Sequence, residues 1–213
     1  MKILIVAATE FEITPLRKRK KILKKKSVDL LVTGVGMTQT AFALGKIFST
    51  KKIDLAINVG VAGSFRKNIP LGTVVNITGD YFADFGAEDG NKFLTAEEMK
   101  LVRSSEFRIR SSGKVTGGRW SVISEIPKVN SITVNTVHGN SASIKKVVNK
   151  FNPDIESMEG AAFFYACAQG KIPCLQIRAI SNYVERRNKK KWKMDLAIQN
   201  LNLFLEKFIS EIS

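Results

Sequence analysis

Cysteine and histidine are scarce in this chain of 213 residues, which has only Cys167, Cys174 and His138. Two thiols do not make the disulfide framework of a small secreted domain, and with one imidazole they do not make a Cys/His metal cluster. Both cysteines have apolar or small neighbours in the sequence. We therefore expect two reduced thiols in the core of a cytoplasmic protein.

Long hydrophobic runs are also lacking, and no stretch is long enough to span a bilayer. The first apolar run is short and turns acidic at Glu10 and Glu12, which argues against a signal peptide and favours a buried first strand. No Pro-rich or Gly/Ser-rich linker interrupts the chain. With 44% hydrophobic residues, we expect one domain over residues 1–213.

Acidic residues are few, with 19 Asp and Glu against 34 Lys and Arg, which gives a net charge of +15. Much of the excess lies in two runs, Arg17–Lys26 and Arg186–Lys193. The first run has almost no aromatic residue for base stacking, and no nucleic-acid motif surrounds either run, so we interpret them as a solvated basic face. Such charge can speed the capture of an anionic small molecule. A basic nucleic-acid-binding protein without turnover remains the alternative from another functional class.

Short apolar runs alternate with helical patterns along the chain. The expected strands are Lys2–Val6, Asp29–Thr33, Asp54–Val59, Thr73–Thr78, Ile132–Thr136 and Cys174–Ile180. The expected helices are Thr38–Phe48, Ser141–Lys150, Ser157–Ala168 and a last one from Met194 to Ile212. Runs that are apolar on both faces suit strands buried between two helical layers, so the pattern predicts an α/β fold with a parallel or mixed sheet. We expect residues 92–129 to be less regular, with loops, a short helix and an extra strand.

Two glycine motifs follow expected strands. The segment from Gly34 to Gln39 begins like a dinucleotide fingerprint, but Gln39 stands where the third glycine belongs, so a tight strand-to-helix turn is the better interpretation. The segment from Asn58 to Ser64, with Gly60 and Gly63, allows the backbone to approach a ligand closely. A plain sharp turn explains the second segment equally well.

Polar residues gather where strands end, and ligands of open α/β sheets bind outside the carboxyl ends of strands. Glu12 follows the first strand, where it suits either acid–base work or a helix N-terminus. Glu156 and Glu159 precede a run of small residues, and a carboxylate there can accept two hydrogen bonds from a ribose diol. Arg178 lies inside the last apolar strand, where a buried guanidinium must meet an acid or a ligand, and Asn182 ends that strand.

Together these segments resemble the purine nucleoside phosphorylase and nucleosidase superfamily over nearly the whole chain. Within it, the sequence is most similar to the futalosine hydrolases of menaquinone biosynthesis. The segments that carry this similarity are Phe82–Asp89, Ser157–Phe164, and the tail Ile180–Glu185 with Arg187, Asn188 and Trp192. The resemblance implies a three-layer α/β/α sandwich around a mixed sheet, assembled as a homo-oligomer, a dimer or higher. It also implies hydrolysis of futalosine, a purine nucleoside with a benzoate on its 5′ arm, with no metal or organic cofactor.

The resemblance also assigns roles to residues. Glu12 activates or orients the attacking water, and Arg178 helps to hold it. Glu159 holds the ribose hydroxyls, Met158 packs on the sugar, and Asn182 faces the imidazole edge of the purine. The remaining candidates for substrate binding are Val61, Gly63 and Val137.

Three positions depart from the related adenosine-type nucleosidases. Those enzymes have Asp at the position of Asn182, a small polar residue at that of Val61, and an aromatic residue near Thr136–Gly139. His138 is a possible base contact or a structural residue. A 5′-methylthioadenosine/S-adenosylhomocysteine nucleosidase or a phosphorylase is the alternative within the same fold. A phosphorylase needs a basic phosphate cradle, for which Arg66 and Arg178 are the candidates.

Overall fold

The main sheet is built around the long strand β3 (Leu55–Ser64). The computed structural model describes residues 1–110 and 121–211. The other strands of this sheet in the described residues are β1 (Ile3–Ala7), β2 (Val28–Val32), β4 (Val74–Phe82), β7 (Arg108–Arg110), β8 (Lys128–Thr133), β9 (Ile155–Ser157) and β10 (Cys174–Tyr183). Their order is β10-β4-β8-β9-β3-β1-β2, with β7 beside β4. Because β10 also pairs with β3, part of the sheet closes on itself.

Strand β3 makes this partial closure possible because its two halves have different neighbours. Its first half pairs with β1 in parallel, and Gly63 and Ser64 at its end pair with β9 in antiparallel fashion. On its other side it runs parallel to β10 over nearly its whole length. The carboxyl ends of β1, β3 and β10 therefore meet at one edge of the sheet, where α/β proteins bind ligands.

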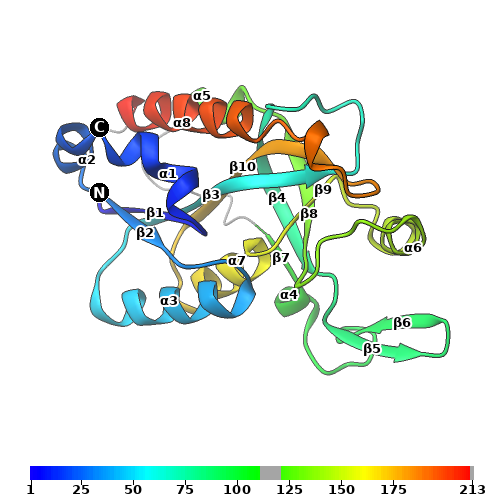
Figure 1. Cartoon of the computed structure of the whole chain (residues 1–213). Coiled ribbons are helices and arrows are strands. Elements are labelled where there is room, and N and C mark those ends of the chain that lie inside the picture. The colour runs from blue at the N-terminus through cyan, green and yellow to red at the C-terminus, as the bar shows by residue number, and fades with distance from the viewer. Residues whose placement is uncertain (111–120, 212–213) are drawn as a thin grey trace.

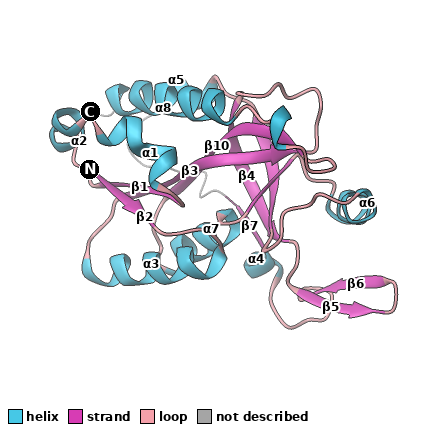
Figure 2. Ribbon diagram, viewed as in Figure 1, coloured by secondary structure: helices cyan, strands magenta, loops and turns pink. Residues whose placement is uncertain are grey.

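Helices cover both faces of the sheet (Figures 1 and 2). On one face lie α1 (Glu10–Arg17), α5 (Ser121–Ser124) and the long α8 (Met194–Glu211), and on the other lie α3 (Met37–Thr50) and α7 (Gly160–Gln169). The remaining helices are α2 (Lys20–Lys25), α4 (Ser104–Phe107), α6 (Ser141–Phe151) and the short 3-10 helix η1 (Lys189–Lys191). This is the three-layer α/β/α arrangement with a mixed sheet that the sequence predicted. No helix in the described ranges is long and apolar enough to cross a membrane.

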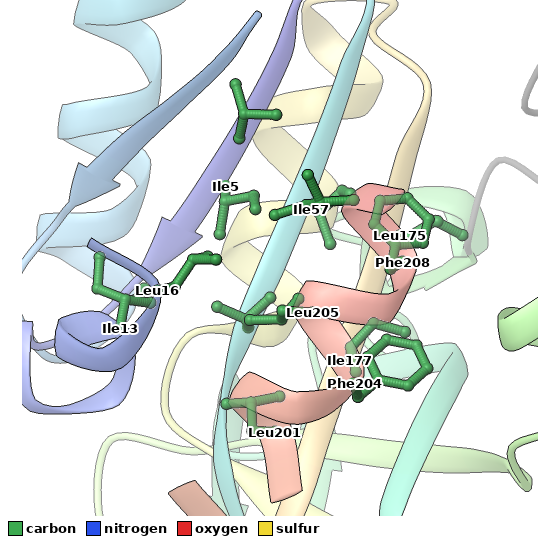
Figure 3. Close-up of a cluster of buried hydrophobic side chains, with 14 of the residues drawn as sticks. Ile5, Ile13, Leu16, Ile57, Leu175, Ile177, Leu201, Phe204, Leu205 and Phe208 are labelled. Atoms are coloured by element: carbon green, nitrogen blue, oxygen red, sulfur yellow. The ribbon is translucent and has the colours of Figure 1, made fainter. Parts of the chain in front are cut away.

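Strand side chains alternate between two cores. In β1, Ile3 and Ile5 face the core under α1 and α8, while Leu4 and Val6 face the core under α3 and α7. Figure 3 shows the first core, where α8 lays Leu201, Phe204, Leu205 and Phe208 over β3 and β10. Each fully buried side chain of this size contributes about 1.5–3 kcal/mol relative to exposure. Burial on both faces explains why the strands are continuous apolar runs in the sequence.

Some boundaries differ from the expected ones. The helix expected from Ser157 begins at Gly160, because residues 155–157 are extended and form β9 between β3 and β8. Helices α1 and α2 and the hairpin of β5 (Gly86–Asp89) and β6 (Lys92–Thr95) were not predicted. Of the irregular region 92–129, β6, α4, β7 and α5 are described, and residues 111–120 lie outside the described residues.

Candidate active site

A cavity of about 660 Å³ opens at the carboxyl ends of β1, β3 and β10. The resemblance assigns catalysis or substrate binding to eight residues, and the lining includes seven of them, namely Glu12, Val61, Gly63, Val137, Met158, Glu159 and Asn182. These residues come from segments far apart in the chain, and the strand order brings them together. Their roles remain predictions, but they share one cavity.

Arg178, the eighth, does not line the cavity but lies beneath it and is 1% exposed. Its guanidinium donates to Gln176 Oε1 at 3.1 Å and to Asn58 Oδ1 at 2.5 Å, and its Nη1 lies 3.4 Å from Glu159 Oε2. The expectation that this buried cation meets an acid is therefore confirmed. Arg178 can act on a ligand through Glu159 and Glu12, not by lining the cavity itself.

Glu12 is held by backbone donors from two elements. Its Oε1 accepts from the backbone N–H of Val61 at 3.1 Å, and its Oε2 accepts from the N–H and hydroxyl of Thr9, the N-cap residue of α1. Burial raises the pKa of Glu12, while the Arg178 charge and the two backbone donors oppose that rise only in part. A carboxylate that is fixed in place and more basic than usual suits general-base work.

Glycine at position 60 leaves the space that this arrangement needs. A methyl group there would lie 2.5 Å from both Glu12 Oε1 and Arg178 Nη1. Any larger residue would force the carboxylate or the guanidinium to move. The Asn58–Ser64 motif is therefore not the sharp turn considered from the sequence, because β3 continues through Ser64. The side chains of Glu12 and Arg178 fill the space that Gly60 leaves beside the backbone.

Glu159 is the N-cap residue of α7, and its Oε1 accepts from the backbone N–H of Gly36 at 3.1 Å. Gly36 has φ of 96° at the N-cap position of α3, a conformation that suits glycine. The strand-to-helix turn predicted at Gly34–Gln39 is confirmed. It positions a carboxylate of the cavity.

A buried polar network continues from Arg178 across the sheet. Gln176 Nε2 donates to Asp80 Oδ2 at 3.1 Å, and Thr133 Oγ1 donates to Asp80 Oδ1 at 2.9 Å. Desolvation raises the pKa of Asp80 to about 6, although these hydrogen bonds and the Arg178 charge oppose the shift. The sequence analysis missed Asp80 and Gln176. Gln176 is a polar residue within the apolar run Cys174–Ile180, whereas Asp80 follows the expected strand Thr73–Thr78. Neither position indicates that β10 pairs with β4 and so brings the two side chains together.

A bulge in β10 presents Asn182 to the cavity. The register against β3 shifts between Ile180 and Asn182, so Ser181 is an extra residue, and bulges redirect side chains in this way. Asn182 Oδ1 accepts from the Ser181 hydroxyl at 2.8 Å, and its Nδ2 donates to the Tyr183 carbonyl at 3.2 Å. The amide therefore has a defined orientation beside Gly63.

Two further groups of residues line the cavity. In the first group, the sequence offered His138 as a possible base contact and Glu156 as a possible ribose carboxylate, whereas the second group was not predicted. His138 and Glu156 form a pair, with His138 Nδ1 2.6 Å from Glu156 Oε2. The mouth of the cavity carries aromatic and charged side chains, namely Phe11, Lys67, Tyr183, Glu185, Arg186, Arg187, Lys191 and Trp192. Their signal was the basic tail segment itself, which the sequence analysis interpreted as a solvated face. Among the described residues, no three His, Cys, Asp or Glu side chains are placed to hold a metal ion.

Comparison with known proteins connects this cavity to a family. Futalosine hydrolase of Streptomyces coelicolor is 26% identical over 183 residues, covering 81% of this chain and 74% of the relative. The 5′-methylthioadenosine/S-adenosylhomocysteine nucleosidase of Bacillus velezensis is 25% identical over 210 residues, covering 85% of this chain and 86% of that protein.

Solved structures show the same fold. The native structure of futalosine hydrolase of Helicobacter pylori has a TM-score of 0.81 at 17% identity, covering 99% of this chain and 98% of that one. A mutant 5′-methylthioadenosine nucleosidase of the same organism, with methylthioadenosine in its active site, has a TM-score of 0.79 at 16% identity, with the same coverage. The family model of the Phosphorylase superfamily matches residues 2–210, and the chain therefore belongs to that superfamily.

Proposed function

We propose that this protein is a purine nucleosidase that hydrolyses the N-glycosidic bond of futalosine. The products are hypoxanthine and dehypoxanthine futalosine, in menaquinone biosynthesis. Curated relatives of both the futalosine and the methylthioadenosine type support cleavage of a nucleoside. We expect it to act in the cytoplasm as a homo-oligomer.

The observation that carries the proposal is the arrangement of polar groups along β3. Glu12, Glu159 and the buried Arg178 gather beside Gly60 and Val61, whereas Asn182 lies beside Gly63. Three residues of strand span about 10 Å, comparable with the length of a purine nucleoside. The cavity thus has one end suited to a sugar and water, and another suited to a base.

Hydrolysis requires water at the anomeric carbon while the bond to the base breaks. Glu12 accepts a proton from that water, and its two backbone contacts hold it in place. The positive charge that develops on the sugar is stabilised by the carboxylates of Glu12 and Glu159. Arg178, fixed by Asn58 and Gln176, balances part of their negative charge before the substrate arrives.

Asn182 favours a 6-oxopurine. Its amide N–H₂ can donate to the carbonyl oxygen of hypoxanthine, and its amide oxygen can accept from N7–H once N7 has taken a proton from water. A carboxylate at this position would instead meet the carbonyl oxygen with no proton between them. Among purine nucleosides, this supports futalosine over methylthioadenosine.

Phosphorolysis is less well supported because the two arginines considered for a phosphate cradle are already engaged. Arg66 binds Asp154 at 3.0 Å and Asn152 at 2.7 Å and is not part of the cavity lining. Arg178 has three side-chain partners in the buried network. Water is therefore the acceptor that we propose.

The test is to incubate the protein with futalosine, inosine or methylthioadenosine, with and without phosphate, and to measure the free base. We expect hypoxanthine from futalosine at a rate that phosphate does not change. Faster release of adenine from methylthioadenosine would support the alternative function, that of a 5′-methylthioadenosine/S-adenosylhomocysteine nucleosidase. Release of base only with phosphate would contradict hydrolysis.

A further inference from the structure

The pair formed by His138 and Glu156 faces the same cavity but has no part in the chemistry above. Glu156 is 4% exposed, and the His138 side chain is 15% exposed. Glu156 Oε1 accepts a hydrogen bond from the backbone N–H of His138 at 3.0 Å, and Glu156 Oε2 lies 2.6 Å from the ring atom Nδ1 of His138. An edge contact with Phe65, with ring centroids 6.2 Å apart, further fixes the imidazole.

This geometry decides which ring nitrogen carries the proton. A carboxylate can only accept, so the proton between the two groups belongs to Nδ1. In the neutral ring, Nε2 then has a free lone pair. Within the described part of the chain, no hydrogen bond occupies Nε2. His138 lines the cavity, so its neutral ring can offer Nε2 as an acceptor to a ligand there.

The position of the pair relates it to the base. A methyl group on Gly63 would lie 3.1 Å from Asn182 Nδ2 and 3.7 Å from Glu156 Cγ, so Asn182 and Glu156 flank the same glycine. In a 6-oxopurine, the carbonyl oxygen has N7 on one side and N1–H on the other. If Asn182 takes the N7 side, an acceptor is needed on the N1 side.

We propose that His138 Nε2, held in this tautomer by Glu156, accepts the N1–H of a 6-oxopurine and so determines the choice of base. Adenine has a lone pair at N1, which would face the lone pair of Nε2. A site that accepts a hydrogen bond from one ligand rejects a ligand that lacks the donor, because the acceptor of the site is then buried without a partner. The inference rests on the proposed function only in assuming that the purine occupies this end of the cavity.

The test measures binding of the free bases hypoxanthine and adenine by calorimetry, which does not depend on turnover. His138→Phe keeps a ring but removes the acceptor, so hypoxanthine binding should weaken about tenfold while adenine binding does not. Glu156→Gln offers an amide donor to Nδ1, which moves the proton to Nε2. This variant should shift the preference further toward adenine. Val137→Ala, in the same loop, is the matched control and should weaken both bases by a similar factor.

Equal changes for the two bases in His138→Phe, or no change in either, would overturn the proposal, because a packing role does not distinguish N1–H from N1. Thermal unfolding of each variant checks that it is folded. The outcome is separable from that of the proposed function. A protein that binds hypoxanthine in this way but releases no base from futalosine would keep the inference and contradict the substrate. Futalosine cleavage by a protein in which His138→Phe does not change base binding would support the proposed function and contradict the inference.

Discussion

Glu12 has the two properties that a general base needs, a fixed position and a carboxylate that is more basic than in water. Burial is the larger influence on its pKa, and the nearby positive charge of Arg178 reverses only part of it. Glu12 must be ionised to accept a proton from water. Activity should therefore fall as the pH falls through its raised pKa, which lies above the ordinary value of 4.5.

The substitution Glu12→Gln should lower kcat/KM for futalosine by roughly a hundredfold or more, the usual worth of one acid–base group. The acidic limb of the wild-type pH profile should disappear in the variant. Steady-state kinetics over a pH series checks both expectations. Near wild-type turnover by the variant would mean that Glu12 serves only to complete the capping box of α1 with Thr9.

The substitution Gly60→Ala tests whether activity depends on the positions of the Glu12 and Arg178 side chains. Gly60→Ala would bring a methyl group within 2.5 Å of both side chains, so we expect kcat to fall at least tenfold in a folded protein. Gly45→Ala in α3 is the control, because nothing lies within 4 Å of a methyl group there. That change should keep activity and stabilise the helix by up to about 1 kcal/mol. Equal activity of the two variants would argue against the positioning role.

The sequence predicted several residues that the structure gathers at the cavity, but it did not predict the buried pair of Asp80 and Gln176. Glu12, Glu159 and Asn182 each follow a recognisable strand end or helix start, so their shared location follows from an α/β fold. Asp80 and Gln176 meet only because β10 pairs with β4 beside β8. That register depends on the partial closure of the sheet, which no local pattern encodes.

At the level of elements, α8 was the most predictable and β9 the least. The apolar stripe of α8 recurs at helical spacing, and Ile198, Leu201, Leu205 and Phe208 are buried as expected. Ile212, the last residue of the expected stripe, lies outside the described residues. Strand β9 has three residues and is extended because β3 and β8 lie on either side of it. Of its three residues, only Ser157 belonged to the expected helix, and no strand was predicted there. Tertiary pairing outweighed local propensity there.

The packing of α8 leads to a prediction about stability. Leu205 is 0% exposed against β3 and β10, whereas Leu203 on the same helix is 59% exposed. Leu205→Ala should lower the free energy of unfolding by about 2–5 kcal/mol, because it removes buried methyl groups and leaves a cavity. Leu203→Ala should change it by less than about 0.5 kcal/mol. Denaturant unfolding of both variants checks this, and similar losses would contradict the placement of α8.

At the scale of the whole molecule, part of the net charge of +15 is concentrated at the mouth of the cavity. Lys67 and Lys191 both contact Glu185, at 2.6 and 3.3 Å, and Arg187 lies over Trp192 at 5.3 Å. One carboxylate among several cations leaves an excess of positive charge there. Such a positive field attracts anionic ligands, and the range of this attraction decreases as the ionic strength rises.

The benzoate expected on futalosine makes the charge testable. Raising the ionic strength from about 0.05 to about 0.5 M should lower kcat/KM for futalosine roughly threefold or more, while kcat stays unchanged. Inosine has no carboxylate, and its kcat/KM should change little, which provides the control. An equal salt effect on kcat/KM for both nucleosides would show that the positive charge does not speed the capture of futalosine. Tight, sequence-independent DNA binding at physiological salt without turnover would instead favour the nucleic-acid alternative.

We propose a site built for a 6-oxopurine nucleoside with an anionic 5′ arm. The most direct measurement is a competition in which the wild-type protein receives equal amounts of futalosine and methylthioadenosine, and the hypoxanthine and adenine released are quantified together. We expect hypoxanthine in excess by a factor of at least about a hundred, since the wrong base leaves buried polar groups unpaired. Equal release, or an excess of adenine, would contradict it.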